Sequence, residues 1–161
     1  MMMNRPKSVH ANVCLSGENG RILFVDSYNR GHSGIKDKLI GGEAEHKKRW
    51  GTSKNEWKSG GYSERMVESI TLFDLLKRYE APQIIDYVAL DVEGAEYDTL
   101  REFPFDVFKI MAVSIEGDSC NELLLSAGYQ QVKNKFNTEA PWEQYFLHQD
   151  FCSYLNHRKR F

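Results

Sequence analysis

The stretch YVALDVEGAEYDTL, residues 87–100, joins an apolar run to a group of acidic side chains. The run starts earlier, in IIDYVALD (residues 84–91), and is rich in β-branched and aromatic residues. Near-continuous apolar runs of this kind are typical of strands that are buried on both faces of a parallel sheet. The stretch therefore predicts a buried strand that ends at Asp91 and is followed closely by Glu93 and Glu96.

The segments around this strand predict an alternation of helices and strands. ITLFDLLKRYEAP, residues 70–82, predicts a helix because its apolar residues recur with the helical period, Thr71 can cap its start and Pro82 can end it. A short helix is predicted from Ala95, and KIMAVSIEG, residues 109–117, predicts a second buried strand. The order over this part of the chain is thus helix, strand, helix, strand.

The remainder of the chain continues the alternation. Ser119 and Glu122 predict a capping box at the start of a third helix, and Gly128 is placed to end it. Residues 129–136 and 142–149 predict two strands, and the short link between them favours an antiparallel pair. Because alternation requires crossover connections, we expect an α/β fold, with a sheet that has helices on both faces.

The N-terminal part of the chain predicts a hairpin and an insertion. Residues 9–15 alternate in polarity, an Asn-Gly turn signal follows, and residues 21–25 predict a second strand. Residues 41–62 are dense in charge, carry glycines at both ends and show no period. We expect a mobile surface insertion there, or a lid over a substrate, within a single domain that spans residues 1–161.

The composition argues against several classes of function. Of the 161 residues 41% are hydrophobic and 27% charged, and a net charge of -2 gives no reason to expect nucleic acid as a partner. The three cysteines form no C-x-x-C pair and no histidine pair has the spacing of metal ligands, so we expect no metal site. No run approaches the ~18 apolar residues of a membrane span, and the N-terminus lacks the apolar core of a signal peptide. The default expectation is a soluble protein of the cytoplasm.

The acidic side chains after the two buried strands are the candidate functional residues. Alternation places Asp91 and Glu93 on one side of the first strand, and Glu116 ends the second. This rim of an α/β sheet binds ligands, and converging carboxylates raise a pKa and so prepare a general base. The alternatives are structural: Asp91 or Glu93 can cap the next helix, and the helix dipole explains Glu96. His148, which follows a late strand, is either an ordinary surface histidine or a substrate contact.

Several stretches together form a known pattern: TLFDLL (71–76), IDYVALDVEGAEYDTLREFPF (85–105) and IMAVSIEG (110–117). They resemble the FkbM-type family of S-adenosylmethionine-dependent methyltransferases. In that family a TLDDLL-like helix precedes a strand that ends in IDxxxxDVEGAE, and a later strand ends in an acidic residue. Residues 4–16 look like the family's third-strand region and residues 143–151 like its last strand. The resemblance therefore covers most of the chain apart from the insertion.

The resemblance implies a Rossmann-like methyltransferase fold. It also implies transfer of a methyl group from S-adenosylmethionine, usually to a hydroxyl oxygen, here on a small molecule or a glycan. Asp91 would lie beside the methionine end of the cofactor, and Glu93 and Glu116 would orient or deprotonate the acceptor. Cys14 and Leu15 match the segment that lines the adenine in such folds.

One part of the family pattern is missing from the chain. It has no strand with a glycine-rich turn for the amino-acid part of the cofactor, and no second strand with an acidic residue for the ribose. The implied strand order is 3-2-1-4-5-7-6, so the sheet would lack its first two β-α units and expose an edge. Three outcomes are open: the hairpin pairs with residues 86–91, a second copy covers the edge, or the chain is a truncated part of a longer protein.

Three functions stay open on the sequence alone. The first is the substrate side of an O-methyltransferase, which predicts that this chain binds S-adenosylmethionine weakly or not at all. The second is a non-catalytic remnant that acts as an interaction module through the sheet edge and the insertion. The third is a metal-dependent hydrolase that uses Asp91, Glu93 and Glu116.

Overall fold

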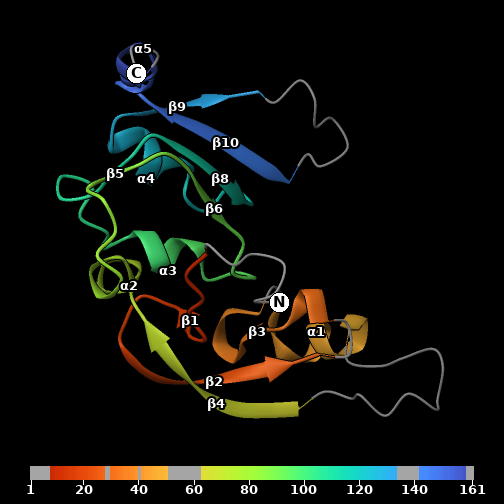
Figure 1. The fold of residues 1–161 in the computed structure, drawn as a ribbon. Coiled ribbons are helices and arrows are strands. Elements are labelled where there is room, and N and C mark those ends of the chain that lie inside the picture. The colour runs from red at the N-terminus through yellow and green to blue at the C-terminus, as the bar shows by residue number, and fades with distance from the viewer. Residues whose placement is uncertain (1–7, 28–29, 40, 51–62, 134–141, 159–161) are drawn as a thin grey trace.

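The computed structural model describes residues 8–27, 30–39, 41–50, 63–133 and 142–158. Within these residues the chain is a mixed α/β protein with three sheets and five α-helices (Figure 1). A four-stranded main sheet belongs to the C-terminal half, and a four-stranded small sheet belongs to the N-terminal half. The third sheet has only two strands. The predicted α/β class is confirmed.

The main sheet has the strand order β6-β8-β10-β9. β6 (Val88–Leu90) runs parallel to β8 (Ala112–Glu116), so the two predicted buried strands are neighbours. β10 (Glu143–His148) lies antiparallel to β8 on one side and to β9 (Tyr129–Val132) on the other. The expectation that the two closing strands form an antiparallel pair is confirmed.

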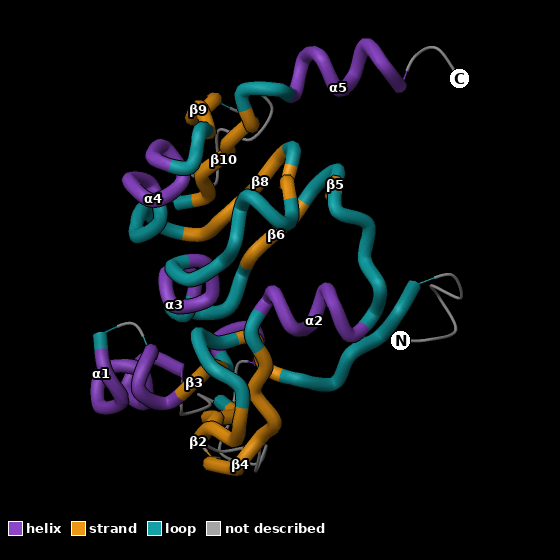
Figure 2. Tube along the Cα trace, turned by 90° about the vertical axis from the view of Figure 1, so that its left-hand side faces the viewer, coloured by secondary structure: helices purple, strands orange, loops and turns teal. Residues whose placement is uncertain are grey.

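The main sheet is covered on one side by α3 (Glu96–Leu100) and α4 (Asn121–Ser126) (Figure 2). The apolar core lies here, with Leu100, Leu124 and Phe146 at 1% exposure or less. Each such side chain contributes about 1.5–3 kcal/mol on burial. The sheet is therefore fixed to these helices by a well-packed interior.

The helix α2 (Leu72–Arg78) starts where the capping signal predicts. The Thr71 hydroxyl accepts a hydrogen bond from the Asp74 backbone N–H at 3.1 Å, which confirms the cap. The Phe73 ring meets Phe108 edge to face, with 6.0 Å between the ring centroids. This aromatic contact connects α2 to the core of the main sheet.

The capping box predicted for α4 is wrong. This helix begins after Cys120, and no side chain makes a capping hydrogen bond to it. The Ser119 hydroxyl instead lies 3.8 Å from the Cys120 sulfur. The end of the helix is as predicted, because Gly128 follows it with a φ of 89°, a conformation that favours glycine.

The apolar run of residues 84–91 forms two short strands rather than one. β5 (Ile84–Ile85) pairs in parallel with β7 (Lys109–Ile110), and these two strands form the third sheet. The chain then shifts at residues 86–87, and β6 continues in the main sheet. At the shift the Tyr87 hydroxyl forms a hydrogen bond with the Ser114 hydroxyl of β8.

The small sheet contradicts the predicted hairpin. Its order is β1-β4-β2-β3, with β1 (Cys14–Leu15), β2 (Gly20–Asp26) and β3 (Gly34–Ile35). β4 (Ser63–Ile70) lies between β1 and β2, parallel to the first and antiparallel to the second. The sequence did not predict β4, because SERMVESI is mostly polar and exposed and lacks the apolar alternation of a half-buried strand.

The pairing of the small sheet decides one of the open outcomes. β1 and β2 pair with β4, so the N-terminal strands do not slide in beside residues 86–91. Among the described residues no strand pairs with the second edge of β6. Self-association through that edge stays a prediction, since free backbone groups of an edge strand can bind another strand.

The insertion predicted over residues 41–62 is partly a helix. α1 (Gly42–Trp50) follows the left-handed residue Gly41 and contains strong helix formers such as Ala44 and Lys47. Within α1, among the residues whose side chains the structure describes, His46 is buried, at 4% exposure. Residues 51–62, including Trp57, lie outside the described residues, so the mobile or lid character of that part stays a prediction.

The C-terminal helix α5 (Phe151–Arg158) was not predicted from the sequence. The Tyr154 hydroxyl donates a hydrogen bond to Asp86, and the Lys109 ammonium pairs with Asp150 just before the helix at 2.8 Å. These contacts place α5 at the end of the main sheet near β5 and β7. No helix in the described part of the chain has the length and apolar character that crossing a membrane requires.

A stability prediction follows from the end of α2. Glu80 has a φ of 51°, and the next N–H, of Ala81, donates to the Leu76 carbonyl at 2.9 Å in a helix-ending motif that favours glycine. We expect Glu80→Gly to raise the free energy of unfolding by about 0.5–1 kcal/mol, measured by urea denaturation. The control Glu122→Gly, inside α4, should lower it by a similar amount. A loss of stability in Glu80→Gly would contradict the strain argument.

Candidate functional site

The site is built on the turn that follows β6. Glu93 has a φ of 53° and Gly94 a φ of 98°. The left-handed region suits glycine, but a glutamate adopts it rarely and at a cost of about 1–2 kcal/mol. Strained residues of this kind persist only where neighbouring groups hold them, and they gather at functional sites.

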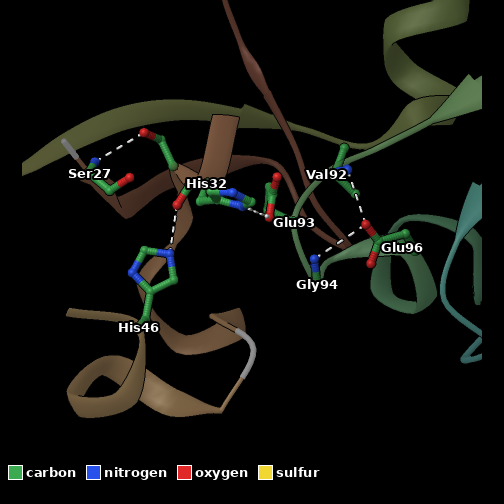
Figure 3. A network of polar contacts seen from close by, with 8 residues as sticks. Ser27, His32, His46, Val92, Glu93, Gly94 and Glu96 are labelled. Atoms are coloured by element: carbon green, nitrogen blue, oxygen red, sulfur yellow. Dashed lines mark hydrogen bonds and ion pairs between the residues drawn. The ribbon is translucent and has the colours of Figure 1, made fainter. Parts of the chain in front are cut away.

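Glu96 is the residue that holds this turn (Figure 3). Its Oε1 accepts hydrogen bonds from the backbone N–H groups of Val92, at 3.0 Å, and of Gly94, at 3.3 Å. Glu96 is 4% exposed and the turn itself is half-buried, so both bonds are partly shielded from water. The sequence predicted only a favourable charge in the first turn of α3, and Glu96 is indeed there. The structure adds that the same carboxylate fixes the strained turn.

The turn and the adjacent strand bring the three predicted carboxylates together. Asp91, Glu93 and Glu116 each offer one carboxylate oxygen, and the three oxygens lie within 4.8 Å of one another. The parallel register Leu90↔Ile115 explains this, since the next residue on each strand is acidic. We call this group the acidic rim. The roles predicted for its members stay predictions.

Burial and mutual repulsion control the charge of the acidic rim. Burial, followed by the charges of Glu116, Asp91 and Glu96, raises the pKa of Glu93 from 4.5 to about 7. Burial and the Asp91 charge also raise the pKa of Glu116. One carboxyl of the rim therefore exchanges its proton near neutral pH, which is what a general base requires.

The loop before β3 forms a second side of the site that the sequence analysis missed. The 3-10 turn Arg30–His32 places the His32 Nδ1 at 3.7 Å from the Glu93 Oε2. Gly34 packs against the same residue, and a Cβ added there would lie 3.2 Å from the Glu93 Cβ. The sequence signal was RGHSG, a histidine with a glycine on either side, but nothing in one sequence connects it to residue 93.

The two predicted adenine-lining residues lie elsewhere in the fold. Cys14 lines a cavity of about 310 Å³ on the small sheet, together with Phe24 and Arg65. No residue of the acidic rim lines that cavity. The Leu15 side chain packs against the apolar core. Cys14 thus lines a cavity that the rim does not share, and the cofactor contacts of Cys14 and Leu15 stay predictions.

His148 is not the ordinary surface histidine considered from the sequence, and a substrate contact stays a prediction. It is 9% exposed, and its ring meets Tyr129 edge to face at 5.3 Å. Its Nδ1 accepts a hydrogen bond from the Asp150 N–H at 3.1 Å, and burial lowers the pKa of the imidazole. His148 is therefore a buried packing residue of β10, not a surface histidine.

The hydrogen bonds of Glu96 give a testable prediction. Glu96→Ala leaves two N–H groups in a buried turn without their acceptor, so we expect the free energy of unfolding to fall by about 3 kcal/mol. Glu96→Gln keeps the Oε1 acceptor and should lose only about 1 kcal/mol. Urea denaturation measures both, with the exposed Glu102→Ala as a control within about 0.5 kcal/mol of the wild type. Equal losses for the alanine and glutamine variants would contradict this role.

The acidic rim also predicts how stability depends on pH. The pKa of Glu93 in the folded protein, about 7, lies above its ordinary value of 4.5, so the folded state binds the proton more tightly. Its contribution to stability is therefore complete below pH 4.5 and is lost as the pH rises through 7, by about 2–3 kcal/mol. Urea denaturation from pH 4 to pH 8 should show this fall in the wild type and a smaller one in Glu93→Gln. An unchanged slope in that variant would assign the effect to other groups.

Comparison with known proteins places this chain in a family. A family model described as the methyltransferase FkbM domain matches residues 2–157, nearly the whole chain. No curated protein matches the chain significantly. No solved structure does either. The match covers the acidic rim, the turn before α3 and the loop of His32. The chain belongs to the FkbM methyltransferase family.

Proposed function

We propose that the chain is an S-adenosylmethionine-dependent methyltransferase that acts on a hydroxyl group of a small molecule or a glycan. The observation that carries the proposal is the acidic rim, in which three carboxylates from two parallel strands meet and one of them titrates near neutral pH. A hydroxyl acceptor must lose a proton when it is methylated, and such a carboxylate can take it. Family membership supports methyl transfer, and the rim supports a hydroxyl acceptor.

The arrangement of the main sheet supports a Rossmann-like fold for this function. In the order β6-β8-β10-β9 the two parallel strands are neighbours, and the last strand of the chain enters between β8 and β9. The acidic rim lies at the carboxyl ends of the parallel pair. Open α/β sheets bind their ligands at this edge.

The residues present fit one end of S-adenosylmethionine. The acidic rim puts negative charge where a cationic sulfonium and amino group can bind, and Asp91 is exposed to solvent there. The described residues contain no strand that runs into a helix through a turn of two or more glycines, the element that would hold the rest of the cofactor. We therefore assign the cationic end of the cofactor, and no other part, to this rim.

The chemistry divides between the cofactor and the side chains of the chain. When bound, S-adenosylmethionine supplies a methyl group that is activated by the sulfonium. Glu93 accepts the proton of the acceptor hydroxyl, because its pKa of about 7 lets it be ionised and still basic near neutral pH. Asp91 and Glu116 hold the acceptor in line by hydrogen bonds from its hydroxyl groups. Most of the acceleration of such a displacement comes from this alignment.

The test is transfer of an isotope-labelled methyl group from S-adenosylmethionine to a panel of polyols, phenols, glycans and amines, followed by mass spectrometry. We expect label on hydroxyl oxygens and a kcat that rises with pH through about 7, since Glu93 must be ionised. Glu93→Gln should lower kcat about 100-fold, and the exposed control Glu102→Gln should leave it unchanged. Label on amines alone, or on no acceptor at a saturating cofactor concentration, would contradict the proposal.

A second measurement examines the cofactor directly. Because the described residues supply only the acidic end of a binding site, we expect calorimetry to show an affinity for S-adenosylmethionine weaker than micromolar. Asp91→Asn should weaken it further, since one negative charge beside the cation is lost. Micromolar or tighter binding would mean that a complete cofactor site exists in this chain.

A further inference from the structure

The loop of His32 is held firmly in place next to the acidic rim (Figure 3). The His46 Nε2–H donates a hydrogen bond to the His32 carbonyl oxygen at 2.6 Å, and His46 itself is 4% exposed in α1. At the start of the same loop the Ser27 N–H donates to the Ser33 hydroxyl at 3.0 Å. Two elements of the N-terminal half, β2 and α1, thus fix the backbone that carries the His32 imidazole.

The same loop is pressed against the strained turn. Gly34 is buried, and an added Cβ would lie 3.2 Å from the Glu93 Cβ and 3.4 Å from the Glu93 carbonyl oxygen. Such spacing is tighter than most Cβ contacts, so a side chain at residue 34 would force Glu93 or the loop to shift by a few tenths of an ångström. The contact with Glu93 therefore depends on the shape of the backbone on both sides and not only on one long side chain.

His32 differs in charge from the other titratable groups that act on Glu93, which are all carboxylates. Three carboxylates, Asp91, Glu96 and Glu116, act on Glu93, and Glu143 acts in turn on Glu116. His32 is the one described group paired with Glu93 that can carry a positive charge. Its side chain is 33% exposed against 21% for Glu93, so the imidazole is the more exposed partner of the pair.

We propose that His32 is a positioning residue of the acidic rim: its protonated imidazole counterbalances the charge of Glu93 and so keeps that carboxylate ionised until it takes the proton of the acceptor. This rests on the proposed function. In that step the acceptor O–H bond breaks as the oxygen is methylated, and its proton binds a Glu93 carboxylate oxygen and is then lost to water. No oxidation or reduction is involved, and Glu93 returns to its ionised state. The present Nδ1–Oε2 separation of 3.7 Å is that of an ion pair, and hydrogen bonds of catalytic groups often tighten only when the substrate is bound.

The test is an NMR titration of the Glu93 carboxyl, with the carboxyl carbon observed from pH 4 to pH 10. His32→Asn removes the positive charge and keeps a planar polar side chain, so we expect the Glu93 midpoint to rise by about 0.5–1 pH unit. His32→Lys keeps a positive charge and should leave the midpoint at or below that of the wild type. The control His157→Asn, on exposed α5, should leave it unchanged. A midpoint in His32→Asn that stays within about 0.2 unit of the wild type overturns the proposal.

A second measurement needs no change at His32, so it holds even if that variant does not fold. The imidazole nitrogen shifts of His32 in the wild type should follow the Glu93 transition, and Glu93→Gln should remove that transition from them. Nitrogen shifts that are the same in wild type and Glu93→Gln overturn the coupling. Both titrations use the chain without cofactor or acceptor. A negative titration therefore rejects the role of His32 without rejecting methyl transfer. A failed methyl transfer assay rejects the proposed function, and the titrations can still be interpreted.

Kinetics then separate a positioning role from a purely structural one. In the methyl transfer assay, His32→Asn should move the acidic limb of the kcat profile to higher pH by the same amount as the titration, with KM unchanged. His32→Lys should return the acidic limb of the kcat profile to the pH at which it lies in the wild type, or below it. A variant that lowers kcat equally at every pH has only disturbed the site and contradicts the proposal.

Discussion

The buried carboxylate of Glu96 is the contact on which the site depends. It accepts the N–H groups of Val92 and Gly94 and so keeps the residue between them, Glu93, in a left-handed conformation. A glutamate in this conformation would otherwise relax, because the strain amounts to about 1–2 kcal/mol. The turn directs β6 into α3 and at the same time turns Glu93 toward the loop of His32. One side chain thereby joins the fold of the main sheet to the geometry of its rim.

The carboxylates of the acidic rim lower the stability of the folded protein. Carboxylates that share a rim within 4.8 Å repel, and burial adds a further cost to their charged forms. A sequence selected for stability alone would replace at least one of them. Three such carboxylates meet at the ends of adjacent strands, and the charge of Glu96 acts on them as well, so the rim lowers the stability of the fold. The fold compensates through the packed core around α3 and α4.

The sequence predicted those elements whose apolar pattern decides their structure. The helix capped by Thr71 and the apolar run before Asp91 were recognised from their side-chain patterns, although the run forms two short strands and not one. The antiparallel closing pair followed from the short link between its strands, and the convergence of Glu116 on Asp91 follows from parallel pairing. β4 was missed because its mostly polar sequence lacks the alternation of a half-buried strand, and α1 because residues 42–50 show no apolar helical period. The role of Glu96 and the approach of His32 depend on tertiary contacts that no local pattern encodes.

The division into separate sheets has a consequence for cooperativity. No strand in the described residues pairs the small sheet with the main sheet, so side-chain packing and isolated links such as the Lys38–Asp98 ion pair hold them together. Segments joined in this way open and close as distinct units in hydrogen exchange, each with its own free energy. His32 belongs to one unit and Glu93 to the other. Their contact therefore reports the docking of the two units, and it vanishes if they separate even while every strand ladder remains intact.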